Sequence, residues 1–170
     1  MQTALMDSPT PPISRSCLAA WCLAVALIFV AYPLQAADTP YPGTMVVKTK
    51  HGFDALVSRV EKAVADHKMG VVAQASASRG AAARGVKIPG NTVLMVFRND
   101  YAVRMLKASV AGGIEAPLRL YITENSDDSA SLTYRLPSAV FAPYGSRELD
   151  KMAKELDVIF QNIVRDAAGG

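Results

Sequence analysis

The sequence contains few of the side chains on which most catalytic and metal centres depend. Of its 170 residues, only two are cysteines and two are histidines. Both cysteines, Cys17 and Cys22, lie in an N-terminal segment that we expect to be removed. The mature chain would then have no disulfide, no thiolate nucleophile and no cysteine-ligated zinc. The histidines, His51 and His67, would lie ~24 Å apart along one straight helix, too far to share a metal ion unless the chain bends between them.

Familiar catalytic and nucleotide-binding motifs are also missing from the sequence. It has no G-x-S-x-G nucleophile elbow, and the Gly- and Ala-rich residues 79–91 lack the Gly-Lys-Ser/Thr of a phosphate-binding loop. The formal net charge of +3 is small and does not indicate a nucleic-acid partner. We therefore expect no metal, no cofactor and no nucleic acid, and we favour a non-catalytic role over an enzymatic one.

The one long hydrophobic run, CLAAWCLAVALIFVAY over residues 17–32, lies near the N-terminus. Arg15 precedes it, and Pro33 and several small residues follow it. A charged start, an apolar centre and small residues at the end are typical of a secretory signal peptide. We expect cleavage after Ala36, with Ala37 as the alternative. A retained membrane anchor is the competing interpretation, although a spanning helix needs about 20 apolar residues.

Cleavage at this position divides the chain into three parts. Residues 1–36 would be the signal peptide, residues 37–43 a flexible lead-in, and residues 44–166 a single domain. Met1 and Met6 are both acceptable starts. The protein would be periplasmic or secreted, with no membrane contact once the signal is cleaved. A mature chain of about 134 residues is long enough for one hydrophobic core.

Hydrophobic periodicity predicts strands and helices along the rest of the chain. Strands are expected over residues 44–50, 71–78, 92–98, 117–124 and 131–137, and the last two read as an antiparallel hairpin. Amphipathic helices are expected over residues 52–68 and after Ser146, which can cap the second helix. The second helix has the longer apolar stripe, formed by Leu149, Met152, Ala153, Leu156, Ile159, Phe160, Ile163 and Val164. A short helix over residues 101–109 is expected to turn Val103, Leu106 and Val110 inward.

These elements predict the fold class. Two amphipathic helices each need an apolar surface to cover, and strands with one apolar face supply it. We therefore predict an α+β fold, a two-layer sandwich with a mostly antiparallel sheet of four or five strands. The two main helices would lie on one face of that sheet.

Four segments resemble one known family. HGFDALVSRVEKAV is similar to the family's Phe-opened first helix, and TVLMVFRN to an apolar strand that ends before Asn. GGIEAPLRLYITE is similar to its Gly-x-acidic-x-Pro-Leu-basic strand entry, and LTYRLP to its Tyr-x-x-Pro strand end. On these motifs the chain resembles the domain of unknown function 302 family over residues 45–165. The resemblance implies a β-α-β(4)-α arrangement and a homodimer, and it implies no settled biochemical activity.

The sequence departs from the family pattern at two places. Arg98-Asn99-Asp100 stands where members often have Gly-Asn-Pro. Ser76-Ala77 stands where members often have an acidic residue and a histidine at the end of the second strand. Any family activity that needs this histidine is therefore not available to this chain.

The candidate ligand-binding residues are Arg98, Asn99, Glu115, Arg119 and Tyr134. Asn99 follows one predicted strand, and Glu115 and Arg119 lie at the start of another, so these side chains can converge where the two strands meet. A pair of guanidinium groups can hold an anion or a carboxylate. The competing interpretation is structural, with Glu115 paired to Arg98 or Arg119 and no ligand.

These observations favour an exported, non-catalytic domain that binds a small anionic or apolar ligand, or a protein partner, as a homodimer. Two alternatives stay open from the sequence. One is a structural or accessory protein of the cell envelope that binds no ligand, and the other is an enzyme of unrecognised type.

Overall fold

The structure is a computed structural model that describes residues 41–169. The expected signal peptide, its cleavage site at Ala36 and the first residues of the lead-in lie outside the described residues. Five strands form one sheet in the order β1-β5-β4-β3-β2, and all neighbours are antiparallel. The strands are β1 (Thr44–Lys48), β2 (Gly70–Ala75), β3 (Asn91–Phe97), β4 (Leu118–Glu124) and β5 (Ala130–Arg135). The predicted α+β fold and antiparallel sheet are confirmed.

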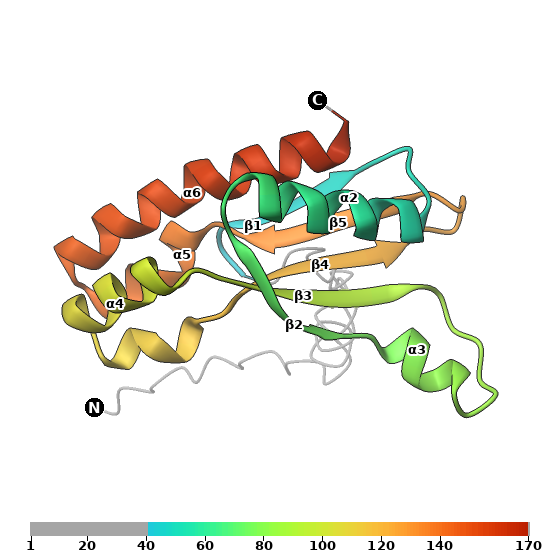
Figure 1. Cartoon of the computed structure of the whole chain (residues 1–170), viewed down its shortest axis with the longest axis horizontal. Helices are drawn as coiled ribbons and strands as arrows, with labels where there is room; N and C mark the ends of the chain where they lie inside the picture. Colours follow the sequence, from blue (N-terminus) through green and yellow to red (C-terminus); the bar gives the residue numbers. More distant parts are fainter. Residues whose placement is uncertain (1–40, 170) are drawn as a thin grey trace, which may run out of the picture. The chain divides into compact units, whose positions relative to one another are not determined.

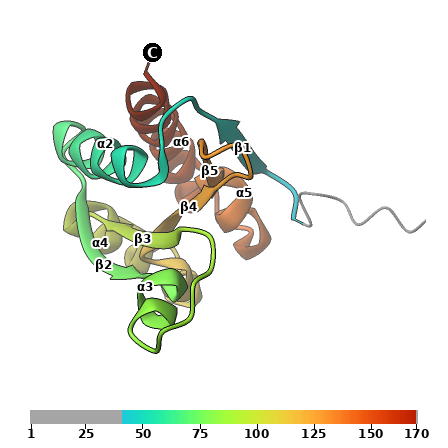
Figure 2. The same ribbon diagram turned by 90° about the vertical axis from the view of Figure 1, so that its right-hand side faces the viewer.

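The two long helices, α2 (Phe53–Asp66) and α6 (Arg147–Ala168), cover one face of the sheet (Figure 1, Figure 2). Period-2 alternation turns one set of strand residues toward these helices, and these residues are fully buried: Leu94, Leu120, Ile122 and Leu132. Leu56 and Val60 of α2 and Phe160 and Ile163 of α6 meet them and are equally buried. Full burial of each such side chain contributes roughly 1.5–3 kcal/mol, so this layer is the core of the domain.

Helix α6 agrees closely with the sequence prediction. The Ser146 hydroxyl accepts a hydrogen bond from the Leu149 amide at 3.3 Å and so caps the first turn. Every residue of the predicted apolar stripe is buried except Ile159, which is partly buried against the core. Gly169, with φ of 105°, ends the helix in the left-handed region that glycine adopts easily.

The segment after β2 differs from the prediction. The expected strand over residues 71–78 ends at Ala75, and a short helix, α3 (Ala77–Ala82), follows. Ser76 starts this helix because its hydroxyl accepts a hydrogen bond from the Arg79 amide at 3.2 Å. A similar change follows β5, where Pro137 opens helix α5 (Pro137–Phe141), followed by η2 (Ala142–Tyr144). A capping hydroxyl thus ends β2, and a proline at the start of a helix ends β5, earlier than their apolar patterns suggested.

Helix α4 (Asn99–Ala108) is present, but its predicted inward face is wrong. Tyr101 and Met105 are the buried residues, whereas Val103 and Leu106 are 45% and 48% exposed. An ion pair between Arg104 of α4 and Glu155 of α6 holds this orientation, with oxygen–nitrogen distances of 2.7 and 2.8 Å.

The apolar residues that α4 leaves outside continue into the next element, η1 (Ala111–Glu115). Val110 and Ile114 are 79% and 83% exposed, so the expectation that Val110 faces inward is also wrong. Leu106 of α4 packs over the backbone of Gly113 in η1. We call the exposed surface of Val103, Leu106, Val110 and Ile114 the α4–η1 ridge.

Candidate functional site

The face of the sheet opposite the two long helices carries two arginines on neighbouring strands. In the register of β4 with β5, Leu120 pairs with Tyr134 and Tyr121 with Thr133. The next position in the same register sets Arg119 opposite Arg135. Because Leu118 and Leu120 point into the core, Arg119 leaves β4 on the open face.

Neither arginine has an acidic partner in the described part of the chain, where no carboxylate oxygen lies within 4.0 Å of either guanidinium group. The Arg135 guanidinium lies over the Tyr41 ring, 5.3 Å from its centroid. The Nε atom of Arg135 is buried and has no hydrogen-bond partner. Like charges directly opposite each other destabilise a sheet, and a buried donor without an acceptor costs free energy as well. An anion bound between the two arginines would relieve the repulsion between their charges.

These arginines lie in a cleft with a volume of about 540 Å³. Its other walls are formed by residues from the sheet, from η1 and from the segments beside them: Tyr41, Val93, Glu115, Leu118, Tyr121, Thr133, Tyr134 and Val140. Small-molecule sites typically have volumes of about 300–1,000 Å³ and combine apolar walls with a few polar groups. The cleft has both the size and the composition of such a site.

Glu115 adds a negative charge to the same cleft. Its Oε1 atom accepts a hydrogen bond from the Tyr144 hydroxyl at 2.9 Å, and this bond raises the pKa of Tyr144. The expected ion pair of Glu115 with Arg98 or Arg119 does not form. Arg98 instead binds Asp100 through Nε and a second nitrogen, at 2.7 and 3.1 Å, which holds the pKa of Asp100 below its ordinary value.

The structure brings together three of the five residues selected from the sequence. Glu115, Arg119 and Tyr134 line the cleft. The Tyr134 ring packs toward the core, with its centroid 6.3 Å from that of Phe160, and burial raises its pKa. Asn99, the exposed first residue of α4, does not line the cleft.

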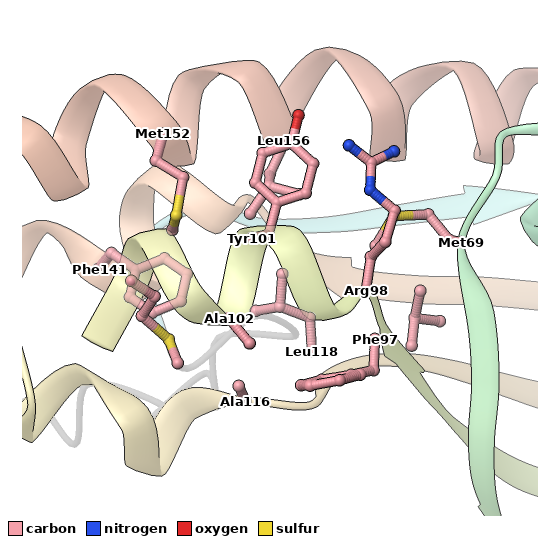
Figure 3. A pocket seen from close by; sticks show the side chains of 12 residues that line it. Met69, Phe97, Arg98, Tyr101, Ala102, Ala116, Leu118, Phe141, Met152 and Leu156 are labelled. Carbon is pink, nitrogen blue, oxygen red and sulfur yellow. The ribbon is translucent and has the colours of Figure 1, made fainter. Parts of the chain in front are cut away.

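Arg98 lines a different and much smaller cavity of about 30 Å³ (Figure 3). Its guanidinium stacks on Tyr101 at 4.3 Å, and Met69 and Met152 approach from opposite ends of the view. A cavity of this size has room for little more than one water molecule. We therefore do not assign a ligand to it.

Sequence reasoning missed Arg135 and Tyr41 as cleft residues. The signal for Arg135 was present, because residues 117–124 and 131–137 were recognised as a hairpin. Once the turn fixes the register of that hairpin, Arg119 and Arg135 must face each other. Tyr41 carried no such signal, since it lies in the irregular segment before β1.

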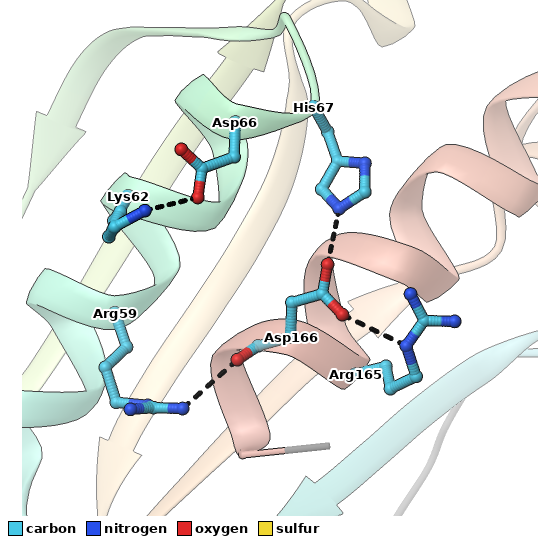
Figure 4. A network of polar contacts seen from close by, with 6 residues as sticks. All are labelled: Arg59, Lys62, Asp66, His67, Arg165 and Asp166. Atoms are coloured by element: carbon cyan, nitrogen blue, oxygen red, sulfur yellow. Dashed lines mark hydrogen bonds and ion pairs between the residues drawn. The ribbon is translucent and has the colours of Figure 1, made fainter.

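The two histidines do not form a metal site. His67 follows α2, and its Nε2 atom lies 2.7 Å from the Asp166 carboxylate near the end of α6 (Figure 4). Hydrogen bonds from His67 and then from Arg165 lower the pKa of Asp166. Arg59 of α2 donates to the carbonyl oxygens of Ala167 and Asp166 at 2.6 and 3.1 Å. This network fastens the end of α6 to α2, and no metal-binding group of three acidic, histidine or cysteine residues occurs within residues 41–169.

The fold and the cleft define a small α+β domain with a cationic site on an antiparallel sheet. The chain belongs to the family described as domain of unknown function DUF302, whose model matches residues 45–167. A solved structure with a similar fold is the uncharacterized conserved DUF302 protein from Bacillus stearothermophilus, with a TM-score of 0.65 and 16% identity. The match covers 74% of this chain and 98% of that chain. No curated protein matches significantly. Among residues 41–169, no helix is both long and apolar enough to cross a bilayer.

Proposed function

We propose that this chain is an exported, non-catalytic domain that binds a small anionic ligand in the cleft on the open face of its sheet. The observation that carries the proposal is the placement of Arg119 opposite Arg135, without a carboxylate partner for either among the described residues. Two guanidinium groups this close supply several donors for one carboxylate or phosphate.

The groups around the cleft favour binding over catalysis. They are two guanidinium groups, one carboxylate, several hydroxyls and apolar side chains. These groups orient a ligand, whereas nucleophilic catalysis would need a nucleophile within hydrogen-bond reach of a base. An accessory envelope protein without a ligand is the alternative, and it leaves the two opposed arginines without an explanation.

Calorimetric titration of the mature protein with acetate, phenylacetate, phosphate and sulfate tests this function. We expect at least one of these anions to bind. We expect Arg119→Gln and Arg135→Gln each to lower the affinity for that anion at least tenfold. Arg84→Gln is the matched control, because Arg84 is exposed and lies outside the cleft. Equal affinity in all four proteins, or no anion binding by the parent protein, would contradict the proposal.

Export rests on the signal-peptide pattern of residues 1–36. N-terminal sequencing of the protein recovered from the periplasm is expected to give Ala37, or the residue after it, as the first residue. Recovery of an intact N-terminus in the membrane fraction would support the retained anchor instead.

We also propose that the α4–η1 ridge is the contact surface of a homodimer. Its four exposed apolar side chains lie within residues 103–114, and exposed apolar patches mark interaction surfaces. Ile114→Asp is expected to convert the dimer to a monomer in sedimentation velocity. Val158→Asp is the control, since Val158 is 57% exposed on α6. A monomeric parent protein would refute the dimer, and a dimer that survives Ile114→Asp would place its interface elsewhere.

A further inference from the structure

We propose that the ligand of the cleft is a zwitterion, an α-amino acid or a similar molecule with an apolar side chain. This inference rests on the proposed anion-binding function and adds a second charge to the ligand. Arg119 and Arg135 would bind the carboxylate, and Glu115 would bind the ammonium group. The apolar walls of the cleft would hold the side chain.

Glu115 has the capacity to accept a further hydrogen bond. Its Oε1 atom is engaged by the Tyr144 hydroxyl at 2.9 Å, which fixes the direction of the carboxylate. Its Oε2 atom accepts no hydrogen bond from any residue between 41 and 169. A carboxylate accepts about four hydrogen bonds in all, so an ammonium group can bind without displacing Tyr144.

The opposite charges of the cleft do not pair with one another. Glu115, Arg119 and Arg135 line one cleft, yet neither arginine comes within 4.0 Å of the Glu115 carboxylate. If these groups were in contact, they would neutralise each other and leave little for a ligand. Because they do not pair, the cleft offers both positive and negative groups to a ligand.

Apolar and aromatic side chains adjoin the two charged ends. Tyr121 pairs with Val93 across β4 and β3, one row away from Arg119 on the same face of the sheet. Tyr121 is 40% exposed although it is a large aromatic residue, and Tyr41 closes the cleft beside Arg135. These rings would bury an apolar side chain that extends from the charged part of the ligand.

Three probes of nearly equal shape separate the contributions of the two charges. L-phenylalanine has both charges, 3-phenylpropionate has only the carboxylate, and 2-phenylethylamine has only the ammonium group. By calorimetric titration of the mature protein, L-phenylalanine is expected to bind at least tenfold more tightly than either of the others. L-leucine is included because a cleft that excludes aromatic rings would bind L-phenylalanine weakly for a reason unrelated to its charges.

Variants at Glu115 assign the second charge to a residue. Glu115→Gln is expected to lower the affinity for the amino acids at least tenfold while changing the affinity for 3-phenylpropionate less than twofold. Tyr144→Phe, which keeps the Glu115 charge but removes its anchor, is expected to show the same selective loss to a smaller extent. Circular dichroism melting of each variant verifies that it is folded.

The outcomes distinguish this inference from the function on which it depends. If 3-phenylpropionate binds as tightly as the amino acids and Glu115→Gln affects neither, the zwitterion is refuted and the anion site stands. If the amino acids fail to bind while acetate or phosphate binds through the arginines, the zwitterion is again refuted and the anion site stands. If no anion of any kind binds, both proposals are refuted.

Discussion

Arg119 and Arg135 lie one position beyond Leu120 and Tyr134, the last paired residues of β4 and β5, and neither arginine has an acidic partner among the described residues. In an antiparallel pair, directly opposed side chains have Cβ atoms about 4.5–5.5 Å apart, so their charges repel each other. On β4 and β5 the helix face is apolar, and the other face also carries the uncharged side chains of Tyr121, Thr123 and Thr133. A local arrangement that opposes stability is better explained by binding than by folding.

Replacement of one opposed arginine is expected to stabilise the ligand-free protein. In Arg119→Thr the repulsion is lost and a residue that suits a strand takes its place, so the free energy of unfolding should rise by about 0.2–1 kcal/mol. Urea denaturation of protein stripped of ligand measures this change. Native mass spectrometry of each protein before stripping measures the loss of ligand retention.

The matched control for this prediction is Lys48→Thr. Lys48 is an exposed cation on β1, opposite Ser131 and not another cation. It is expected to change stability by less than Arg119→Thr does. If Arg119→Thr destabilises the protein while ligand retention persists, Arg119 has a structural role and the cleft is not the binding site.

A substitution in the hydrophobic core is expected to change stability much more than the substitution of Arg119. Leu156 is 3% exposed in the middle of α6, so Leu156→Asp would bury a carboxylate without a partner. Such burial costs several kcal/mol, against a total stability of about 5–15 kcal/mol for a typical domain. Circular dichroism is expected to show an unfolded or strongly destabilised protein. Val158→Asp, two residues further along the same helix and 57% exposed, should melt close to the parent protein.

The parts of the fold that the sequence predicted are those with strong, simple periodicity. Helix α6 has an apolar stripe from Leu149 to Val164, about four turns long, and a capping serine, and both are present as expected. In β4 the buried Leu118, Leu120 and Ile122 alternate with more exposed residues, whereas the first three residues of β5 are all buried. In each case the apolar residues of the local pattern are the ones that become buried. No knowledge of tertiary contacts was needed to predict which side of the element faces the core.

Helix α4 shows where such reasoning fails. Its ten residues include apolar side chains on more than one side, so its periodicity alone did not choose between Val103 with Leu106 and Tyr101 with Met105. Which face of α4 turns inward depends on its contacts with α6, including the Arg104–Glu155 ion pair. These contacts join residues about fifty positions apart in the chain. The site depended on the same kind of information, because Arg119 and Arg135 become neighbours only through the register of the hairpin.

The ion pair between α4 and α6 predicts a pH-dependent contribution to stability. The hydrogen bond from Arg104 lowers the pKa of Glu155 in the folded protein. A carboxyl group with a lowered pKa stabilises the fold above its unfolded pKa of about 4.3, and this contribution is lost as the pH falls through the lower, folded pKa. Glu155→Gln should therefore lower the melting temperature at pH 7, and the difference from the parent should shrink below about pH 4.

Melting curves of both proteins between pH 3 and pH 7 test this prediction. Glu148→Gln is the control, because Glu148 lies on the same helix and makes no ion pair with a described residue. A difference for Glu155→Gln that is constant over the whole pH range would show that the ion pair contributes nothing and that the effect of the substitution has another cause.

Two glycines with the same backbone geometry provide a final comparison. Gly43 and Gly85 have φ angles of 76° and 74°, in the left-handed region where any other residue is strained by about 1–2 kcal/mol. At Gly85 an added Cβ would meet nothing within 4 Å, whereas at Gly43 it would collide with the Cβ of Ala139. The carbonyl oxygen of Gly43 also accepts a hydrogen bond from the Leu136 amide at 2.8 Å, which ties the start of β1 to the end of β5.

Gly85→Ala should therefore cost only the backbone strain, about 1–2 kcal/mol. Gly43→Ala should cost clearly more, because either β1 or the helix α5 that contains Ala139 must move to relieve the collision. Since β1 is an edge strand held by β5 alone, the movement should loosen β1 first. Urea denaturation compares the two costs, and hydrogen exchange should show faster exchange in β1 for Gly43→Ala only. Equal costs for the two variants would mean that the close approach of Gly43 to Ala139 is not part of the folded structure in solution.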